Sequence, residues 1–319
     1  MFPPSWFQSA AKNIYPYILQ TPLTYDADLD LYLKWENQQI TGSFKARGAF
    51  NKVLNLHEWE RQRGLVTASA GNHGQGLALA GKTLNSPVTI FTSEHAARNK
   101  LDAMQALGAT LITVKGGYAE AEIAGLSYAE ENEATWVSPY NDGLVIAGQG
   151  TIGLEILQQA PEMSDSTWLV PVGGGGLISG VALAVKDNPD LRKKTAPFII
   201  GVQSEASAFM HALFYQNTQK GVVEYPSLAD GLEGAVENRS VTIHLVRRFV
   251  DEIILVDEEE IAKAIKFAWQ KYHQKIEGSA AVTLAAVISG KITQRPVLAI
   301  ITGGNIDLHL HQELISDKV

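Results

Sequence analysis

The sequence predicts an α/β protein of two domains, each an open, mostly parallel sheet flanked by helices. Short apolar runs rich in β-branched residues alternate with helix-like stretches along nearly the whole chain, which is typical of parallel sheets. Several of these runs are continuously apolar, as expected for strands that are covered on both faces. A length of 319 residues is sufficient for two medium-sized domains.

The predicted strands share a short apolar or β-branched run bounded by turn residues. They lie at 31–35, 65–69, 87–92, 110–114, 135–138, 167–172, 197–203, 252–256 and 296–301. Helical patterns occupy 95–107 and 119–132, and the spacing of Asp257 and Glu260 predicts a capping box before a helix at 261–271. Turn residues at Gly64 and at 139–143 mark domain boundaries. We expect a small mobile domain at 64–141 and a large domain of 1–63 and 142–319.

Composition and charge limit the function classes. Hydrophobic residues make up 45% and charged residues 19% of the chain, as in proteins with a substantial core. A formal net charge of -8 argues against nucleic acid or an anionic membrane as a partner. The absence of cysteine excludes disulfides and thiolate chemistry. With neither a signal-peptide pattern nor a run long enough to span a membrane, we expect a cytoplasmic protein.

Four consecutive glycines stand between a predicted strand and a predicted helix: Gly173, Gly174, Gly175 and Gly176. Without Cβ atoms the backbone can turn several N–H groups toward one anion, and the helix dipole favours the same charge. A nucleoside-triphosphate loop is excluded, because Leu177 stands where a lysine is required. Three interpretations stay open: a site for a compact phosphomonoester, a dinucleotide site formed by the G-x-G-x-x-S pattern from Gly174 with Glu205 on the ribose, or a loop whose glycines serve only tight helix–strand packing.

Three further segments place polar groups at the ends of predicted strands. Lys45 begins a predicted helix, and if desolvated it would act as a Schiff-base amine or proton carrier; otherwise it is a surface lysine, with Thr41 or Ser43 as a simple helix cap. The loop 69–73 offers a hydroxyl, an amide and an imidazole at a helix start, which is either a carboxylate cradle or an ordinary turn. Thr302 presents a hydroxyl at a sheet edge, or caps the next helix.

Taken together and in order, these segments resemble the serine/threonine dehydratase family, pyridoxal 5′-phosphate (PLP) enzymes of the tryptophan-synthase-β type of fold (fold type II). The matching motifs are SFKARG at 43–48, SAGNH at 69–73, AGQGT at 147–151, the four glycines, ADG at 229–231 and TGGN at 302–305. The resemblance implies an ammonia-lyase that removes water from L-threonine or L-serine, giving a 2-oxo acid and ammonia. Alternatives are 3-hydroxyaspartate as the substrate, or serine racemisation. We also expect a homodimer or homotetramer.

The resemblance implies a role for each segment. Lys45 would carry PLP as a Schiff base, with Phe44 beside it, and Thr302 would contact the ring nitrogen. The phosphate would be held by Gly173, Gly174, Gly175, Gly176 and the N–H of Leu177. The 3′-oxygen would contact Asn72. The substrate carboxylate would be bound by Ser69, Ala70, Gly71, Asn72 and His73, on a small domain that closes over the amino acid.

Four departures and absences narrow these expectations. Racemases of the family usually have a serine at the position of Ala70, so elimination is favoured over racemisation. Some members bind a divalent cation through a glutamate where this chain has Gln203, so no metal site is predicted. No Lys or Arg occurs between Gly116 and Val185, which favours threonine or serine over a substrate with a second carboxylate, unless Arg47 or a distant residue contributes. Because the chain ends soon after the last motif, we expect no C-terminal regulatory domain.

Overall fold

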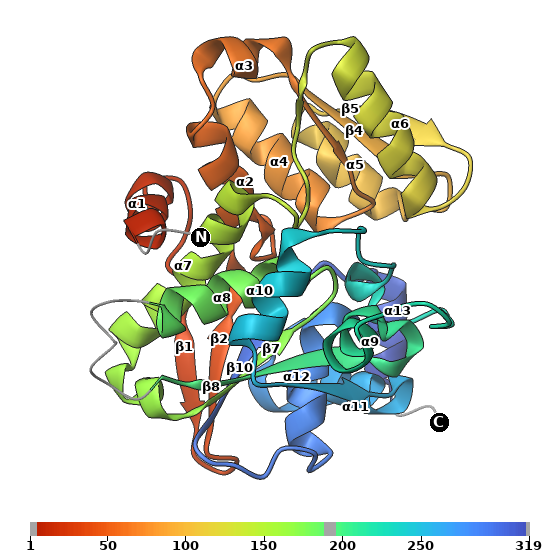
Figure 1. Ribbon diagram of the computed structural model, residues 1–319. Coiled ribbons are helices and arrows are strands. Elements are labelled where there is room, and N and C mark those ends of the chain that lie inside the picture. Colours follow the sequence, from red (N-terminus) through yellow and green to blue (C-terminus); the bar gives the residue numbers. More distant parts are fainter. Residues whose placement is uncertain (1–4, 188–195, 317–319) are drawn as a thin grey trace.

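The computed structural model describes residues 5–187 and 196–316 and contains two sheets (Figure 1). One sheet has six strands in the order β1-β2-β10-β7-β8-β9, and the other has four in the order β5-β4-β3-β6. Neighbouring strands are parallel, except that β1 runs antiparallel to β2. The α/β class with two mostly parallel sheets is therefore confirmed, and the domain boundaries stay a prediction.

The nine predicted strands are all present, and one further strand was not predicted. The strands are β1 (Leu23–Asp26), β2 (Leu31–Trp35), β3 (Leu65–Ala68), β4 (Val88–Ser93), β5 (Thr110–Val114), β6 (Thr135–Trp136), β7 (Thr167–Pro171), β8 (Phe198–Ser204), β9 (Glu252–Val256) and β10 (Val297–Ile301). The unpredicted strand is β1, an edge strand in which Asp26 alone is buried, so it has no apolar pattern to detect.

The helices of the described residues are α1 (Ser5–Ile14), α2 (Lys45–Leu54), α3 (Glu58–Arg63), α4 (Asn72–Thr83), α5 (Arg98–Ala106), α6 (Tyr118–Glu131), α7 (Gly143–Gln159), α8 (Gly176–Lys186), α9 (Phe209–Gln216), α10 (Val241–Phe249), α11 (Glu258–Tyr272), α12 (Gly278–Ile288) and α13 (Leu308–Ile315). The predicted capping box opens α11: Asp257 Oδ1 accepts from the Glu260 N–H at 2.8 Å, and Glu260 Oε2 accepts from the Asp257 N–H at 2.9 Å. Within the described residues, no helix has the length and apolar character needed to cross a lipid bilayer.

The core of the six-stranded sheet explains its continuously apolar strands, because alternate residues pack into two different helical layers. On one face, Trp168 of β7 and Ile300 of β10 are buried in a cluster with α7, α8 and α10. On the other face, Leu169 of β7 and Ala299 of β10 are buried in a cluster with α11 and α12. All four side chains are fully buried, so these central strands are apolar on both faces.

Helix α2 joins the two sheets. Phe50 of this helix is buried in one cluster with Leu77 of α4, Ile90 of β4 and Val145 of α7. On the opposite face of the four-stranded sheet, α6 packs over β3 and β4 (Figure 1). Helix α2 begins at Lys45. This lysine therefore lies between the six-stranded sheet and the helices that cover the four-stranded sheet.

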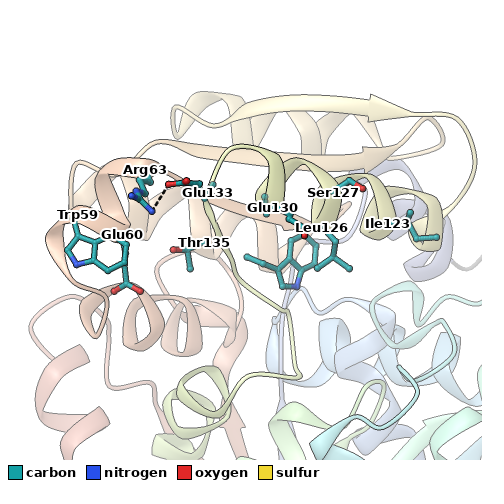
Figure 2. Close-up of a pocket in the computed structure, with 12 residues that line it drawn as sticks. Trp59, Glu60, Arg63, Ile123, Leu126, Ser127, Glu130, Glu133 and Thr135 are labelled. Atoms are coloured by element: carbon teal, nitrogen blue, oxygen red, sulfur yellow. Dashed lines mark ion pairs between the residues drawn. The ribbon is translucent and has the colours of Figure 1, made fainter.

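A surface groove lies beside the four-stranded sheet, between α3 and α6 and along β6 (Figure 2). Exposed Trp59, Ile123 and Leu126 line it, together with the ion pair between Arg63 and Glu133 at 2.8 Å. None of the predicted site residues lines this groove, so it is separate from the site described next.

Candidate active site

Sheet topology brings three of the predicted segments to one edge. Strands β2, β10 and β7 are neighbours and run parallel, so their carboxyl ends lie side by side. The chain after β2 leads to Lys45, the chain after β10 begins with Thr302, and the chain after β7 is the glycine run. Phe44 ties the first two together, because its N–H donates to the Thr302 carbonyl at 3.0 Å. Ligands of α/β proteins bind at such an edge.

The glycine run is packed so closely that it has no room for side chains. A Cβ atom on Gly173 would lie 3.0 Å from Leu232 Cα, and one on Gly174 would lie 2.5 Å from Tyr140 Cγ. Gly175 has a φ of +86°, which disfavours any residue with a side chain. Helix α8 begins immediately afterwards, so the N–H groups of its first turn have no acceptor within the helix. These features fit a backbone cradle for a phosphate group.

Lys45 is a partly buried lysine with one polar contact. Its Nζ donates to the Pro139 carbonyl at 3.1 Å and lies 5.3 Å from the centre of the Phe44 ring. Burial lowers the pKa of Lys45 to about 8, although Glu277 acts in the opposite direction. More of this lysine is therefore a neutral amine near pH 7 than of an exposed lysine. Helix α2 has no side-chain cap, so the alternative that Thr41 or Ser43 caps it is wrong.

The loop after β3 wraps around the hydroxyl of Ser69. The Ser69 Oγ accepts from the N–H groups of Gly71 at 3.1 Å and Gly74 at 3.0 Å, so it fixes the turn into α4. Ala70 at the tip of this loop is exposed. Because α4 starts at Asn72, the loop presents the positive end of a helix dipole.

His73 is buried and uncharged. The pKa of His73 is lowered to about 3, mainly by burial and also by the charge of Lys45. Its Nε2 lies 3.1 Å from the Val137 carbonyl, which only accepts, so Nε2 carries the proton. Its Nδ1 is therefore an acceptor, and this buried atom has no partner among the described residues.

Asn72 is held by a glutamate that the sequence analysis did not predict. The Asn72 amide Nδ2 donates to Glu277 Oε1 at 2.6 Å, and its oxygen accepts from Asn305 Nδ2 at 2.7 Å. Glu277 is buried in front of α12. Its pKa is raised to about 7, mainly by burial and also by Asp230, while Lys100 acts in the opposite direction. An acidic residue before a predicted helix resembles an ordinary cap, so sequence carried no signal for this contact.

Lys100 is a second residue that was not predicted. It lies on α5 and forms an ion pair of 2.5 Å with Asp230, which lies on the short 3₁₀ turn η4 (Asp230–Leu232). A Cβ atom on Gly71 would lie 3.4 Å from Lys100 Cδ and 3.8 Å from Lys100 Nζ. The lack of Lys and Arg in the segment 116–185 therefore does not leave the loop without a cation. A cation beside the loop comes from α5.

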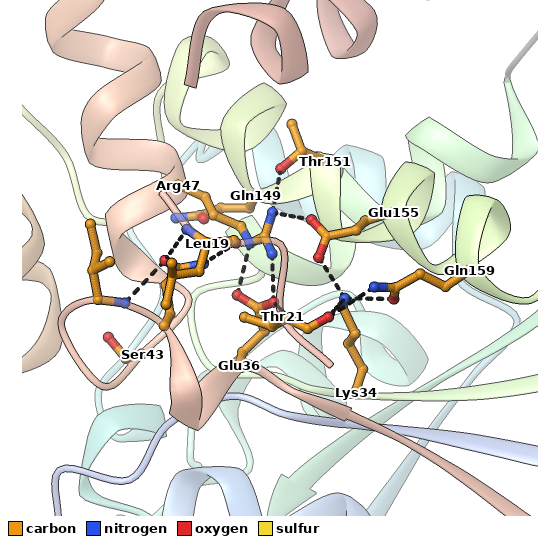
Figure 3. A network of polar contacts seen from close by, with 12 residues as sticks. Leu19, Thr21, Lys34, Glu36, Ser43, Arg47, Gln149, Thr151, Glu155 and Gln159 are labelled. Carbon is orange, nitrogen blue, oxygen red and sulfur yellow. Dashed lines mark hydrogen bonds and ion pairs between the residues drawn. The ribbon is translucent and has the colours of Figure 1, made fainter. Parts of the chain in front are cut away.

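Arg47, the other cation considered, is committed to a buried ionic network (Figure 3). Its Nε and Nη2 each donate to Glu36 at 2.7 Å, and its Nη1 donates to Glu155 at 2.8 Å. Lys34 Nζ donates to the other oxygen of Glu155 at 2.6 Å, and all four charged side chains are fully buried. Burial of Glu36 would raise its pKa, but Arg47 holds it below its usual value. The network anchors the start of α2 and leaves Arg47 no contact with a substrate.

Gln203, at the position considered for a metal ligand, is buried at the end of β8. Its side-chain oxygen accepts from the His211 N–H at 3.0 Å. Within residues 5–187 and 196–316, no three His, Asp or Glu side chains are grouped as a metal ion would require.

A family model described as "Pyridoxal-phosphate dependent enzyme" matches residues 14–303. The chain belongs to this family. PLP is therefore its cofactor, which argues against the interpretation of the glycine run as a dinucleotide loop. An L-threonine ammonia-lyase of Thermotoga maritima is 42% identical over 317 residues, which cover 97% of this chain and 76% of that protein.

Two solved structures of similar fold cover 97% of the chain. Maize serine racemase has a TM-score of 0.87 at 30% identity, with 95% of its own chain covered. The processed form of threonine deaminase isoform 2 from Solanum lycopersicum has a TM-score of 0.85 at 32% identity, with 92% covered. The expectation of a fold type II PLP enzyme is thus confirmed.

Proposed function

We propose that this enzyme eliminates water from L-threonine, and also from L-serine, to give a 2-oxo acid and ammonia. The observation that carries the proposal is the desolvated amine of Lys45 at the sheet edge that also holds the glycine cradle and Thr302. The names of the similar proteins, L-threonine ammonia-lyase and threonine deaminase, support the choice of substrate.

The residues at this edge fit PLP. The N–H groups of Leu177 and of the glycines Gly173, Gly174, Gly175 and Gly176 would hold its phosphate, and Lys45 would bond to its aldehyde carbon. Phe44 would lie beside the ring, Thr302 would face the ring nitrogen, and Asn72 has a second amide hydrogen for the 3′-oxygen. PLP bound in this way supplies an electron sink for bond cleavage at the substrate Cα.

Lys45 would also remove the proton from the Cα atom of the substrate. As a free amine, Lys45 Nζ would keep a useful fraction neutral near pH 7, because burial lowers its pKa to about 8. This Nζ would take the Cα proton of the substrate. The Pro139 carbonyl, which accepts from Nζ at 3.1 Å, would hold the amine in place while it does so.

The loop from Ser69 to His73 would bind the substrate carboxylate. It offers N–H groups at the start of α4 and the Asn72 amide, and His73 stays neutral because of its low pKa. Because Gly71 has no side chain, the carboxylate would be able to approach the backbone there. We propose that residues 64–141 move as a small domain and close this loop over the amino acid, which would exclude water.

Racemisation is the second candidate, because maize serine racemase has a similar structure. It requires a protic group on the face of the substrate opposite Lys45. The exposed residue of the substrate loop is Ala70, whose methyl group cannot exchange a proton. This observation favours elimination.

The test is a panel of L-threonine, L-serine and 3-hydroxyaspartate, scored for release of 2-oxo acid and for D-amino acid. Release from threonine and serine without racemisation supports the proposal. It is wrong if neither substrate reacts, or if Lys45→Ala retains turnover and the absorbance of the bound cofactor. Ala70→Ser tests the racemisation argument, since it restores a hydroxyl at the tip of the loop.

We extend the proposal to the setting of the enzyme: a cytoplasmic homodimer or homotetramer without a nucleic-acid partner. The formal net charge of -8 supports the last point. Light scattering of the purified holoenzyme measures the assembly, and a monomer at micromolar concentration would contradict it.

A further inference from the structure

The proposed carboxylate loop contains no charge of its own. Ser69 has its hydroxyl turned to the backbone, Asn72 is an amide, and His73 is neutral. Every amino-acid substrate, however, brings a carboxylate that gives up hydration when the site closes. A full positive charge beside the loop would compensate that loss far better than neutral groups do.

Lys100 supplies such a charge. Its Nζ lies 3.8 Å from the position of a Cβ atom on Gly71, at the centre of the loop. Its side chain is only 16% exposed, and α5, which carries it, packs against α4, whose first residue follows Gly71. Burial alone would lower the pKa of Lys100, but Asp230 raises it above its usual value, so the ammonium group is charged.

Asp230, the partner of Lys100, is the more exposed member of the pair. Its side chain is 50% exposed, so its carboxylate can return to water at little cost. The turn that carries it is fixed on both sides. Gly231 N–H donates to Ser279 Oγ at 2.9 Å, and Leu232 packs on Gly173. Asp230 therefore pairs with Lys100 from a turn that packs against the glycine run, and its carboxylate can move while its backbone stays in place.

We propose that Lys100 binds the α-carboxylate of the amino acid, and that Asp230 is the carboxylate it holds when no substrate is present. Binding then exchanges one carboxylate partner of Lys100 for another. This inference rests on the proposed function, since it assumes that the loop from Ser69 to His73 receives the carboxylate. The alternative is a purely structural role, in which the ion pair only holds α5 against η4; we call this a clasp.

The two roles differ in the sign of one effect. If Asp230 competes with the substrate for Lys100, Asp230→Asn tightens binding. If the pair is a clasp that favours closure, Asp230→Asn weakens binding as Lys100→Met does. Lys100→Arg keeps the charge and restores binding in part. Lys82→Met, at an exposed lysine of α4, is the matched control.

The experiment uses the holoenzyme and two probes that cannot lose water, L-2-aminobutyrate and its amide, followed by the change in cofactor absorbance. Lys100→Met is expected to weaken binding of the carboxylate probe about ten- to a hundredfold and to leave the amide unchanged. Asp230→Asn is expected to strengthen binding of the carboxylate probe severalfold. With L-threonine, Lys100→Met raises KM more than it lowers kcat.

Three results would overturn the assignment of Lys100. They are equal weakening of both probes by Lys100→Met, weaker binding in Asp230→Asn, and an effect of Lys100→Met confined to turnover of 3-hydroxyaspartate. The last result would make Lys100 a residue for the substrate side chain. A wild-type enzyme that neither turns over threonine nor responds to L-2-aminobutyrate would instead refute the proposed function. The two failures are therefore distinguishable.

Discussion

Replacement of Arg47 by methionine tests whether the buried ionic network supports the active site. The change removes the guanidinium that contacts Glu36 twice at 2.7 Å and Glu155 once at 2.8 Å. Glu155 keeps Lys34, but Glu36 is left fully buried without a cation in contact. Breaking a buried pair in this way costs about 3–5 kcal/mol. With roughly 2 cal/mol/K of unfolding entropy per residue, this cost lowers Tm by about 4–8 °C.

The assay is thermal and urea unfolding of the apoprotein, followed by circular dichroism. Arg63→Met is the matched control, because Arg63 and its partner Glu133 have side chains 48% and 70% exposed, so its loss costs less than about 1 kcal/mol. Adding Glu36→Gln to Arg47→Met should cost less than the sum of the single changes, because it removes the stranded charge. The reasoning is refuted if Arg47→Met costs no more than Arg63→Met, or if the two costs add.

Three further predictions concern the site. Uptake of PLP by the apoprotein accelerates with pH, because only the neutral amine of Lys45 reacts, and its rate is half-maximal near pH 8. A half-maximal rate above about pH 10 in stopped-flow absorbance would contradict this. Gly174→Ala weakens PLP binding about tenfold or more, because the added methyl group would lie 2.5 Å from Tyr140 Cγ. In the control Gly117→Ala the added methyl group would lie 3.6 Å from Glu120 Oε2, so the affinity for PLP measured by titration is unchanged. Glu277→Gln stabilises the protein by up to about 3 kcal/mol at pH 8 but not at pH 4. The pKa of Glu277 is raised to about 7, so the ionised carboxyl destabilises the folded protein increasingly as the pH rises. Unfolding curves with the same pH dependence in both proteins would disprove this prediction.

The parts of the fold that sequence predicted are those set by local pattern. Short apolar runs predicted β7 and β10, and all residues of both strands are buried. The capping box of Asp257 and Glu260 needs only four neighbouring residues. Lys45 at the start of α2 and the four glycines at the start of α8 were found for the same reason. The edge strand β1 was missed because it carries no such pattern.

The parts of the site that sequence could not predict depend on contacts between distant segments. Lys100 meets Asp230 across 130 positions of the chain, and Asn72 meets Glu277 across 205. Neither pair has a spacing that a local rule can detect. The desolvation that lowers the pKa of Lys45 also arises from several segments packed together, so sequence left open whether this lysine is buried.

The most direct test of the central claim is to locate the covalent bond between protein and cofactor. Holoenzyme is reduced with borohydride, digested, and analysed by mass spectrometry, with Lys45→Ala treated in parallel. The account predicts a phosphopyridoxyl group on Lys45 in the wild-type protein, and neither this group nor 2-oxo acid release from L-threonine in the variant. A label on another lysine, or turnover of threonine by Lys45→Ala at the wild-type rate, would contradict it.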